Sequence, residues 1–431
     1  MSAPIAFAVP AWLSLVIWTC LVFGRGGFWR ADIRLPEPDV VPAPRTGAAA
    51  ESDWPGVTAI IPARDEAEML PATLPSILGQ DYPGRLDVIV VDDASADGTS
   101  DVAHEVAARF PDRSLTVLRT QGPPPGWAGK VAAMNSGLAA GADAAGGAEP
   151  SRYVLFTDAD IAHPADSVRC LVRHAETDER DLVSLMALLS TGSAAERAIV
   201  PAFVYSFFQL YPPAWVRRPA AATAAAAGGC MLVRRETLEK AGGLEQISGA
   251  RIDDVALAGL IKGAGGDGGQ AGRRSRGGDG KGGQGGRIWL GTTDRVLSLR
   301  PYPRLADLWD MIARSAYTQL RYSPWLLAGT LLGLLLTYAV PPVFGLVFLA
   351  VAAAGGNGAF WLVAAPSLAA WLLMSASYLP VLRLYRLKAW RAPLLPGVMM
   401  IYGAMTADSA RRHRRGRGGS WKGRVEQRVE H

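Results

Sequence analysis

The stretch Leu86–Thr99, which reads LDVIVVDDASADGT, decides the fold class of this chain. Its apolar run, which ends at Val91, is continuous rather than alternating, as is typical of a parallel strand covered on both faces. Asp92 and Asp93 follow that run directly, and Asp97 opens a helical stretch to about residue 110. The stretch therefore predicts a βα unit with acidic side chains at the carboxyl end of its strand.

The same alternation continues on both sides of this stretch. Asp65 and Glu68 are interpreted as a capping pair for the helix that follows the first strand. Successive βα units predict an α/β fold with a doubly wound, Rossmann-like sheet that binds ligands at the carboxyl ends of its strands. The apolar runs expected as strands are Val57–Ile61, Leu115–Leu118, Tyr153–Thr157 and Ile288–Leu290, and the expected helices include Glu66–Leu78 and Val131–Ala140.

A second acidic pair, Asp158 and Asp160, follows the strand at Tyr153–Thr157. Carboxylate oxygens suit Mg²⁺ or Mn²⁺, whose remaining ligands are commonly supplied by substrate phosphates. Asp is also common in turns and helix caps, and Asp160 could cap a helix that begins near Pro164. Because Asp92 and Asp93 also stand at a strand end, we favour a site that holds a divalent cation and a ribose or diphosphate.

A third acidic pair, Asp253 and Asp254, precedes a helix expected at Val255–Lys262. Helix capping explains one of the two. The functional interpretation makes one of them a general base that takes a proton from an acceptor hydroxyl.

Two further candidate residues, Lys130 and Asn135, stand at the start of a helix after a strand, where they could contact a nucleotide. The segment before Lys130 is not a Walker loop, because its spacing is wrong and no Ser or Thr follows the lysine.

Apolar runs near both ends predict membrane segments. Ala6–Phe23 is followed by arginines and preceded by none, which places the residues after it on the cytoplasmic side of the inner membrane. Trp325–Ala354 and Ala359–Leu382 are long enough for two further spans, whereas 392–407 fits an interfacial or re-entrant helix better. A signal peptide and a transporter are the alternatives, but no clear cleavage site and no ionisable residue inside the spans support them.

These features predict five segments: an N-terminal anchor (1–24), a linker (25–54), a cytoplasmic α/β domain (55–322), a membrane region (325–407) and a basic cytoplasmic tail (408–431). Within the α/β domain, 263–286 is so rich in glycine that we expect a disordered insertion. The basic residues lie beside the apolar runs, so we expect contact with anionic lipid and no nucleic-acid binding. Three separated cysteines suit a reducing compartment.

With these residues in place, the chain resembles glycosyltransferase family 2, whose members are inverting enzymes with the GT-A fold. The resemblance rests on IIPARDE (60–66), DDASADGT (92–99), GKVAAMN (129–135), the DAD at 158–160 and the Asp253-Asp254 pair, where Asp65 and Asp253 replace the usual Asn and Glu. It implies a UDP-sugar donor, a metal held by Asp160 and a catalytic base at Asp254. The residues that it implies for nucleotide-sugar binding are Pro62, Arg64, Glu66, Asp92, Asp93, Lys130 and Asp158.

A narrower resemblance is to the hopene-associated glycosyltransferases of hopanoid biosynthesis. It rests on the N-terminal anchor, GPPPGWAGK (122–130), SAYTQLRYSP (315–324) and the basic C-terminal segment. It implies a polycyclic triterpenoid or similar membrane lipid as acceptor. TQLRY departs from the QxxRW signature of processive family members, although Arg321 could still touch the donor diphosphate. Transfer to a polyprenyl phosphate or a ceramide-like lipid, and a non-catalytic nucleotide-sugar-binding protein, remain open alternatives.

Overall fold

The computed structural model describes residues 3–35, 54–143, 149–263, 286–356, 358–415, 420–421 and 424–425. It divides into two compact units, each described here by itself. The helical unit comprises Met1–Asp32, Thr191–Ala214 and Pro301–Gly419, and the sheet unit comprises Ile33–Ser190, Trp215–Arg300 and Ser420–His431. Most of the predicted glycine-rich insertion, much of the predicted linker and the end of the predicted tail lie outside the described residues.

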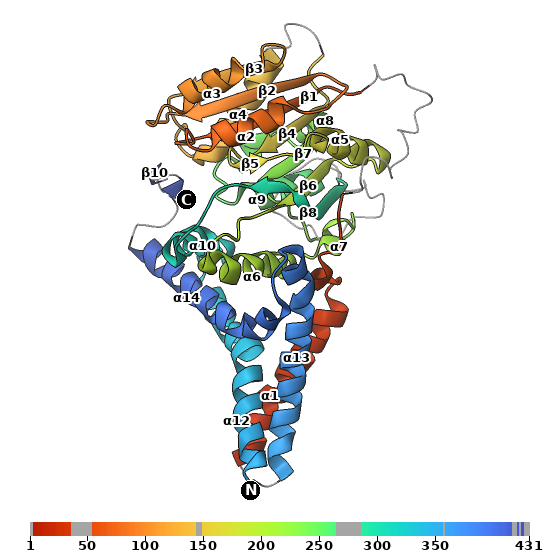
Figure 1. The fold of residues 1–431 in the computed structure, drawn as a ribbon, viewed down its shortest axis with the longest axis vertical. Coiled ribbons are helices and arrows are strands. Elements are labelled where there is room, and N and C mark those ends of the chain that lie inside the picture. Colours follow the sequence, from red (N-terminus) through yellow and green to blue (C-terminus); the bar gives the residue numbers. More distant parts are fainter. Residues whose placement is uncertain are drawn as a thin grey trace, which may run out of the picture. The chain divides into compact units, whose positions relative to one another are not determined.

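The described strands of the sheet unit form one mixed sheet in the order β3-β2-β1-β4-β7-β6-β8-β5, in addition to the short pair β9 and β10 (Figure 1). The half made of β3, β2, β1 and β4 is parallel, as the sequence predicts. Strand β7 runs antiparallel to β4 and β6, so the sheet is not parallel throughout. The strands are β1 Val57–Ala63, β2 Leu86–Asp93, β3 Ser114–Thr120, β4 Tyr153–Thr157, β5 Ile161–Ala162, β6 Leu182–Leu188, β7 Cys230–Arg234, β8 Ile288–Ser298, β9 Ser420–Trp421 and β10 Arg424–Val425.

Helices pack on the sheet and bury its central strands on both faces, whereas β3 at the edge stays partly exposed. Every residue of β1 and β4 is buried, and apart from Thr58 and Thr157 their side chains are apolar. Helix α4 packs so closely on β1 and β2 that a Cβ on its Gly137 would lie 2.5 Å from Ile60 and 3.0 Å from Val91. The helices of this unit are α2 Leu70–Leu78, α3 Thr99–Ala107, α4 Gly129–Asp143, α5 Ser167–Thr177, α8 Arg235–Lys240, η4 Leu244–Ile247 and α9 Asp253–Gly263, while the short α7 Pro213–Val216 lies where the two units divide.

The strand order brings the carboxyl ends of three strands together. Strand β1 pairs with β2 on one side and with β4 on the other, all in parallel. The chain therefore reverses its direction of travel across the sheet at β1, which is the position where open α/β sheets bind ligands. Asp92 and Asp93 end β2, Asp158 and Asp160 follow β4, and the third predicted pair, Asp253 and Asp254, lies elsewhere at the start of α9.

The helical unit contains the predicted membrane segments. Among the described residues, three helical stretches are long and apolar enough to span a membrane: Ala6–Gly24, Pro324–Ala353 and Gly358–Leu384. These agree with the three predicted runs, and the second continues through Pro341 and Pro342 without a break. The elements are α1 Ala3–Thr19, η1 Cys20–Gly24, η2 Phe28–Arg30, α6 Ala194–Leu210, α10 Leu305–Gln319, α11 Pro324–Leu334, η5 Leu335–Ala339, α12 Val340–Ala353, η6 Gly358–Phe360, α13 Trp361–Leu384, η7 Ala389–Leu394 and α14 Leu395–Arg414.

The predicted boundary at residue 408 falls inside a helix. Helix α14 runs on to Arg414 and packs along α10. Asp408 accepts a hydrogen bond from Trp309 Nε1 at 2.9 Å, and Arg412 pairs with both Asp408 and Asp310 at 2.7 Å. Most of the predicted interfacial segment and the first part of the predicted tail therefore form one continuous helix, which begins at Leu395. Whether residues 392–407 lie at a membrane surface stays a prediction.

Candidate active site

The loops after β1 and β2 are joined by hydrogen bonds that explain why DDASADGT has its composition. Ser95 Oγ accepts from Asp65 N, and Asp65 Oδ1 accepts from Ala96 N, both at 2.9 Å. The side chains of Asp97 and Thr99 accept from the backbone of the β1 loop in the same way. The predicted capping pair was wrong, because Asp65 has a left-handed φ of 50° and serves this loop, while α2 begins only at Leu70.

The predicted nucleotide-binding residues on these two loops are largely enclosed. Asp92 and Asp93 are each 1% exposed, and Asp92 Oδ1 accepts from Ser95 N at 2.8 Å. Arg64 Nη1 donates to the carbonyl of Asp93 at 2.6 Å, which holds the guanidinium against the end of β2. Pro62 lies buried within β1. In this structure the two acids thus shape the loop, and their contact with a nucleotide stays a prediction.

Lys130 connects two of the predicted acidic pairs. It lies in the first turn of α4, and its Nζ is 2.7 Å from Asp158 Oδ1 and 3.0 Å from Asp253 Oδ2. Burial lowers the pKa of this lysine, but the two carboxylates outweigh burial and raise it above its ordinary value, so the ammonium stays charged. Asp253 is therefore more than a helix cap, because its side chain faces the same cation as Asp158.

Asp254 lies beside this cluster at the start of α9. Its Oδ2 accepts from Gly228 N at 3.0 Å and its Oδ1 accepts from Val255 N at 2.7 Å. Burial and the negative charge of Asp253 raise the pKa of Asp254 to about 7, although Lys130 and the two backbone donors act against the shift. A carboxyl with a pKa near neutrality is suited to general base catalysis.

Asp160 contacts two residues, Ser298 and Arg300, that were not predicted from the sequence. Ser298 Oγ donates to Asp160 Oδ2 at 2.9 Å, and Arg300 Nε lies 3.4 Å from the same oxygen. Arg300 Nη2 also donates to both carboxylate oxygens of Glu66, at 2.7 and 2.6 Å. Glu66, predicted to contact the nucleotide, is buried and paired with this arginine. The only sign of Arg300 in the sequence is that a basic residue stands just beyond the end of a strand.

The residues around Asp160 fit a divalent cation whose other ligands come from a substrate. The acids Asp158, Asp160, Asp253 and Asp254 outnumber the two bases that contact them. Burial, together with repulsion from Asp160 and Asp253, raises the pKa of Asp158 to about 6, although Lys130 acts against the shift. Within the described ranges no three His, Cys, Asp or Glu side chains converge as a complete metal site. Mg²⁺ commonly binds one or two carboxylates together with substrate phosphates, so a site of that kind would not need three converging protein ligands.

The last predicted site residue, Arg321, belongs to the helical unit. It and Tyr322 form the turn between α10 and α11, with left-handed φ values of 50° and 56°. Tyr322 stacks on His413 of α14 with ring centroids 4.3 Å apart, and its carbonyl accepts from Tyr317 Oη at 2.7 Å. The turn is therefore strained but well supported, and the contact of Arg321 with a diphosphate stays a prediction.

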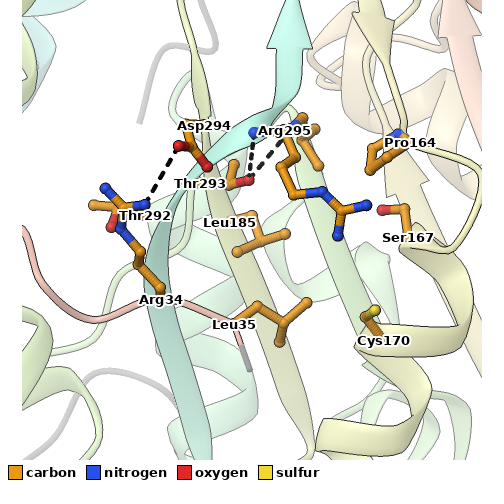
Figure 2. Close-up of a pocket in the computed structure, with 11 residues that line it drawn as sticks. Arg34, Leu35, Pro164, Ser167, Cys170, Leu185, Thr292, Thr293, Asp294 and Arg295 are labelled. Atoms are coloured by element: carbon orange, nitrogen blue, oxygen red, sulfur yellow. Dashed lines mark hydrogen bonds and ion pairs between the residues drawn. The ribbon is translucent and has the colours of Figure 1, made fainter. Parts of the chain in front are cut away.

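The hollow drawn in Figure 2 lies apart from these residues on the sheet unit. Its lining includes none of the predicted site residues and consists of Arg34, Leu35, Pro164, Ser167, Cys170, Leu185, Thr292, Thr293, Asp294, Arg295 and Val296. Its charged groups are paired, since Arg34 lies 3.3 Å from Asp294 and Arg295 lies 2.8 Å from Asp166. The hollow offers no cluster of acids comparable with that around Lys130.

Comparison with known proteins agrees with the motifs. Over 88 residues, 20% of this chain, it is 35% identical to "Probable glycosyltransferase YdaM" of Bacillus subtilis (strain 168). Over an equal length it is 32% identical to "Glycosyltransferase AglE" of Haloferax volcanii. The chain spans only 20% and 27% of these two relatives.

Two solved structures are similar at lower identity. The mannosyltransferase PcManGT from Pyrobaculum calidifontis, in complex with GDP-Man and Mn²⁺, is 22% identical with a TM-score of 0.48, covering 93% of this chain and 98% of that chain. Glucosyl-3-phosphoglycerate synthase from Mycobacterium tuberculosis, in complex with Mn²⁺, UDP-Glc and phosphoglyceric acid, is 18% identical with a TM-score of 0.37, covering 64% and 84%. Residues 58–242 match the family model described as "Glycosyl transferase family 2". This part of the chain is therefore a glycosyl transferase family 2 domain.

Proposed function

We propose that this protein transfers a sugar from a nucleotide-sugar donor, UDP-linked by resemblance, to a hydroxyl group of a membrane lipid with inversion at the anomeric carbon. One observation carries the proposal: Lys130 lies between Asp158 and Asp253, with Asp254 adjacent, at the edge where open α/β sheets generally bind ligands. This arrangement combines a fixed cation, acids for a metal and a separate carboxyl of raised pKa. Those are the groups that sugar transfer from a diphosphate requires.

The donor would bind along the loops after β1, β2 and β4. Arg64 and Lys130 are the cations that these loops and α4 offer to its phosphates, and Asp158 would contact the sugar or ribose. Asp160 would hold Mg²⁺ or Mn²⁺, which when bound neutralises charge on the leaving diphosphate. Asp92 and Asp93, which are buried and shape the loop after β2, would contact the uridine.

Asp254 would accept the proton of the acceptor hydroxyl as that oxygen attacks the anomeric carbon. Its two backbone donors, Gly228 N and Val255 N, fix the carboxylate in one orientation. A proton acceptor of pKa about 7 is about half ionised at neutral pH and is basic enough to take the proton. Glycine at 228 keeps this space open, because a Cβ there would lie 3.1 Å from Lys130 Nζ.

The acceptor would be a lipid of the bilayer in which the three apolar helical stretches would anchor this protein. The three apolar helical stretches support a multi-pass protein, and the arginine pattern supports an inner membrane location with the sheet unit on the cytoplasmic face. By resemblance the lipid would be a hopanoid. A soluble enzyme could not meet such an acceptor without extracting it from the membrane.

Transfer by the purified full-length protein in detergent tests this proposal. The protein is incubated with UDP-sugars, a divalent cation and a hopanoid-containing lipid extract, and the product is identified by mass spectrometry and its anomeric configuration by NMR. Asp254→Asn should abolish transfer while UDP binding is retained. Asp101→Asn, at the exposed first turn of α3, is the matched control and should remain active.

The rival functions give different results in the same assay. An active Asp254→Asn variant with a polyprenyl phosphate acceptor would favour that acceptor, since a phosphate oxygen needs no strong base. A product of retained anomeric configuration would reject direct displacement. UDP-sugar binding without transfer or hydrolysis under any condition would favour a non-catalytic binding protein.

A further inference from the structure

Arg300 is the residue that links the metal position of the proposed function to the loop after β1. It lies just beyond β8, and its guanidinium contacts Asp160 on one side and Glu66 on the other. Arg300 and Glu66 are 234 positions apart in the chain. Glu66 is 7% exposed, so its carboxylate requires a compensating charge, and Arg300 supplies it through two hydrogen bonds.

The two contacts of Arg300 are unequal. Both Glu66 oxygens lie within 2.7 Å of Nη2, whereas Nε is 3.4 Å from Asp160 Oδ2. The Glu66 contact thus anchors the guanidinium, and the Asp160 contact is the looser one. If Asp160 takes another cation, Arg300 retains its anchoring partner and is not left as an isolated charge. Loss of the Asp160 contact therefore leaves the guanidinium paired, whereas loss of the Glu66 contact would leave a buried carboxylate without its partner arginine.

We propose that Arg300 acts as a positively charged competitor at Asp160, which keeps the affinity for a free divalent cation low until a nucleotide diphosphate is present. A fixed positive charge beside a carboxylate repels a second cation that approaches the same carboxylate. The diphosphate of the donor adds negative charge and further oxygen ligands, which offset that repulsion. Metal and donor then bind together, and Arg300 is a positioning residue rather than a catalytic one. This inference rests on the proposed metal role of Asp160.

Direct measurement of Mn²⁺ binding tests the inference without an activity assay. Free Mn²⁺ is quantified by electron paramagnetic resonance during titration of the full-length protein in detergent, first without nucleotide and then with UDP. Arg300→Met should bind Mn²⁺ at least about tenfold more tightly than wild type without UDP, as expected when one nearby unit charge is removed from a divalent ion even at the dielectric constant of water. With UDP the difference between the two proteins should become smaller.

Two further variants separate charge from structure. Arg295→Met is the matched control, because Arg295 lies on β8 and pairs with Asp166 rather than with the site, so its Mn²⁺ affinity should equal that of wild type. Ser298→Ala removes the neutral donor to Asp160 Oδ2 and leaves the charge of Arg300 in place. Its Mn²⁺ affinity without UDP should not increase. If Arg300→Met fails to fold because Glu66 is left unpaired, the double variant Glu66→Gln/Arg300→Met removes both charges and should show the same increase.

Unchanged or weaker Mn²⁺ binding by Arg300→Met, or by the folded double variant, overturns the competitor role and leaves Arg300 as an orienting group for Asp160. That result leaves the proposed function intact as long as wild type binds Mn²⁺ with UDP. Absence of Mn²⁺ binding by every protein, with UDP present, would instead reject both the inference and the proposed metal site. A wild-type affinity for Mn²⁺ that is already as high without UDP as with it would also overturn the inference.

Discussion

Asp254→Asn should make the protein more stable at alkaline pH while it removes the proposed base. Holding a carboxyl of pKa about 7 in its ionised form costs about 4 kcal/mol relative to an unfolded chain, in which Asp ionises near pH 4. Asp254 is half-buried, and water screens part of that cost, so we expect about 2 kcal/mol. Asn keeps an oxygen that can accept from Gly228 N and lacks the charge.

The pH dependence has a defined sign. The folded carboxyl keeps its proton up to about pH 7, whereas the unfolded carboxyl loses it near pH 4. The stability that the protonated form contributes is therefore complete below about pH 4 and is lost as the pH rises through about 7. The difference in the free energy of unfolding between Asp254→Asn and wild type should therefore grow from about pH 4 to about pH 7 and stay constant above it.

Thermal unfolding of the two proteins in the same detergent, measured from pH 4.5 to 8.5 in steps of about half a unit, gives the assay. An advantage of about 2 kcal/mol corresponds to a melting temperature roughly 4–8 °C higher for a unit of this size. Asp101→Asn controls for the loss of a surface acid. An advantage of Asp254→Asn that is absent at pH 8, or equal at pH 5 and pH 8, would refute the raised pKa and with it the reason for choosing Asp254 as the base.

Three further changes around the predicted site have expected outcomes. Lys130→Met leaves Asp158 and Asp253 facing each other, so we expect a loss of about 3 kcal/mol in thermal unfolding and a pH profile of transfer displaced to higher pH. Gly228→Ala places a Cβ 3.1 Å from Lys130 Nζ and should lower turnover at least about tenfold, whereas Gly259→Ala, whose Cβ meets nothing within 4 Å, should not. Arg321→Gly relieves a left-handed φ and should stabilise the protein by about 1 kcal/mol, while raising the KM for the donor if Arg321 contacts the diphosphate.

The parallel half of the sheet could be predicted because its signals are local. Tyr153–Thr157 was expected as a strand and is β4 with the same bounds, since a strand buried on both faces is apolar at nearly every position. The acids at the end of β2 and after β4 could be placed for a related reason. A parallel sheet brings the ends of neighbouring strands to one edge, so residues just beyond those strands are brought together by topology alone.

The contacts that complete the site could not be predicted, because they depend on distant segments and on antiparallel pairing. Strand β7 enters the sheet against β4, and its short sequence carries no sign of direction. The pair of Arg300 with Glu66 joins the segment just beyond β8 to the loop after β1. At Asp65, by contrast, a local sequence signal predicted a helix cap that the structure does not have. An acid before a helix is a common capping signal, but the hydrogen bonds to the β2 loop provided a stronger alternative.

The opposite stability changes expected for Lys130→Met and Asp254→Asn form one argument about this cluster. Both changes should reduce transfer, but one removes a cation that offsets neighbouring acids and the other removes an acid whose ionisation is unfavourable. A residue kept only for stability would not have a variant that is more stable and inactive. If Asp254→Asn gains stability while Lys130→Met loses it, the carboxyl at 254 is retained at a cost to the fold, and that cost is what a catalytic role predicts. If both variants lose stability equally, the cluster is a structural ion-pair network, and the base must be sought elsewhere.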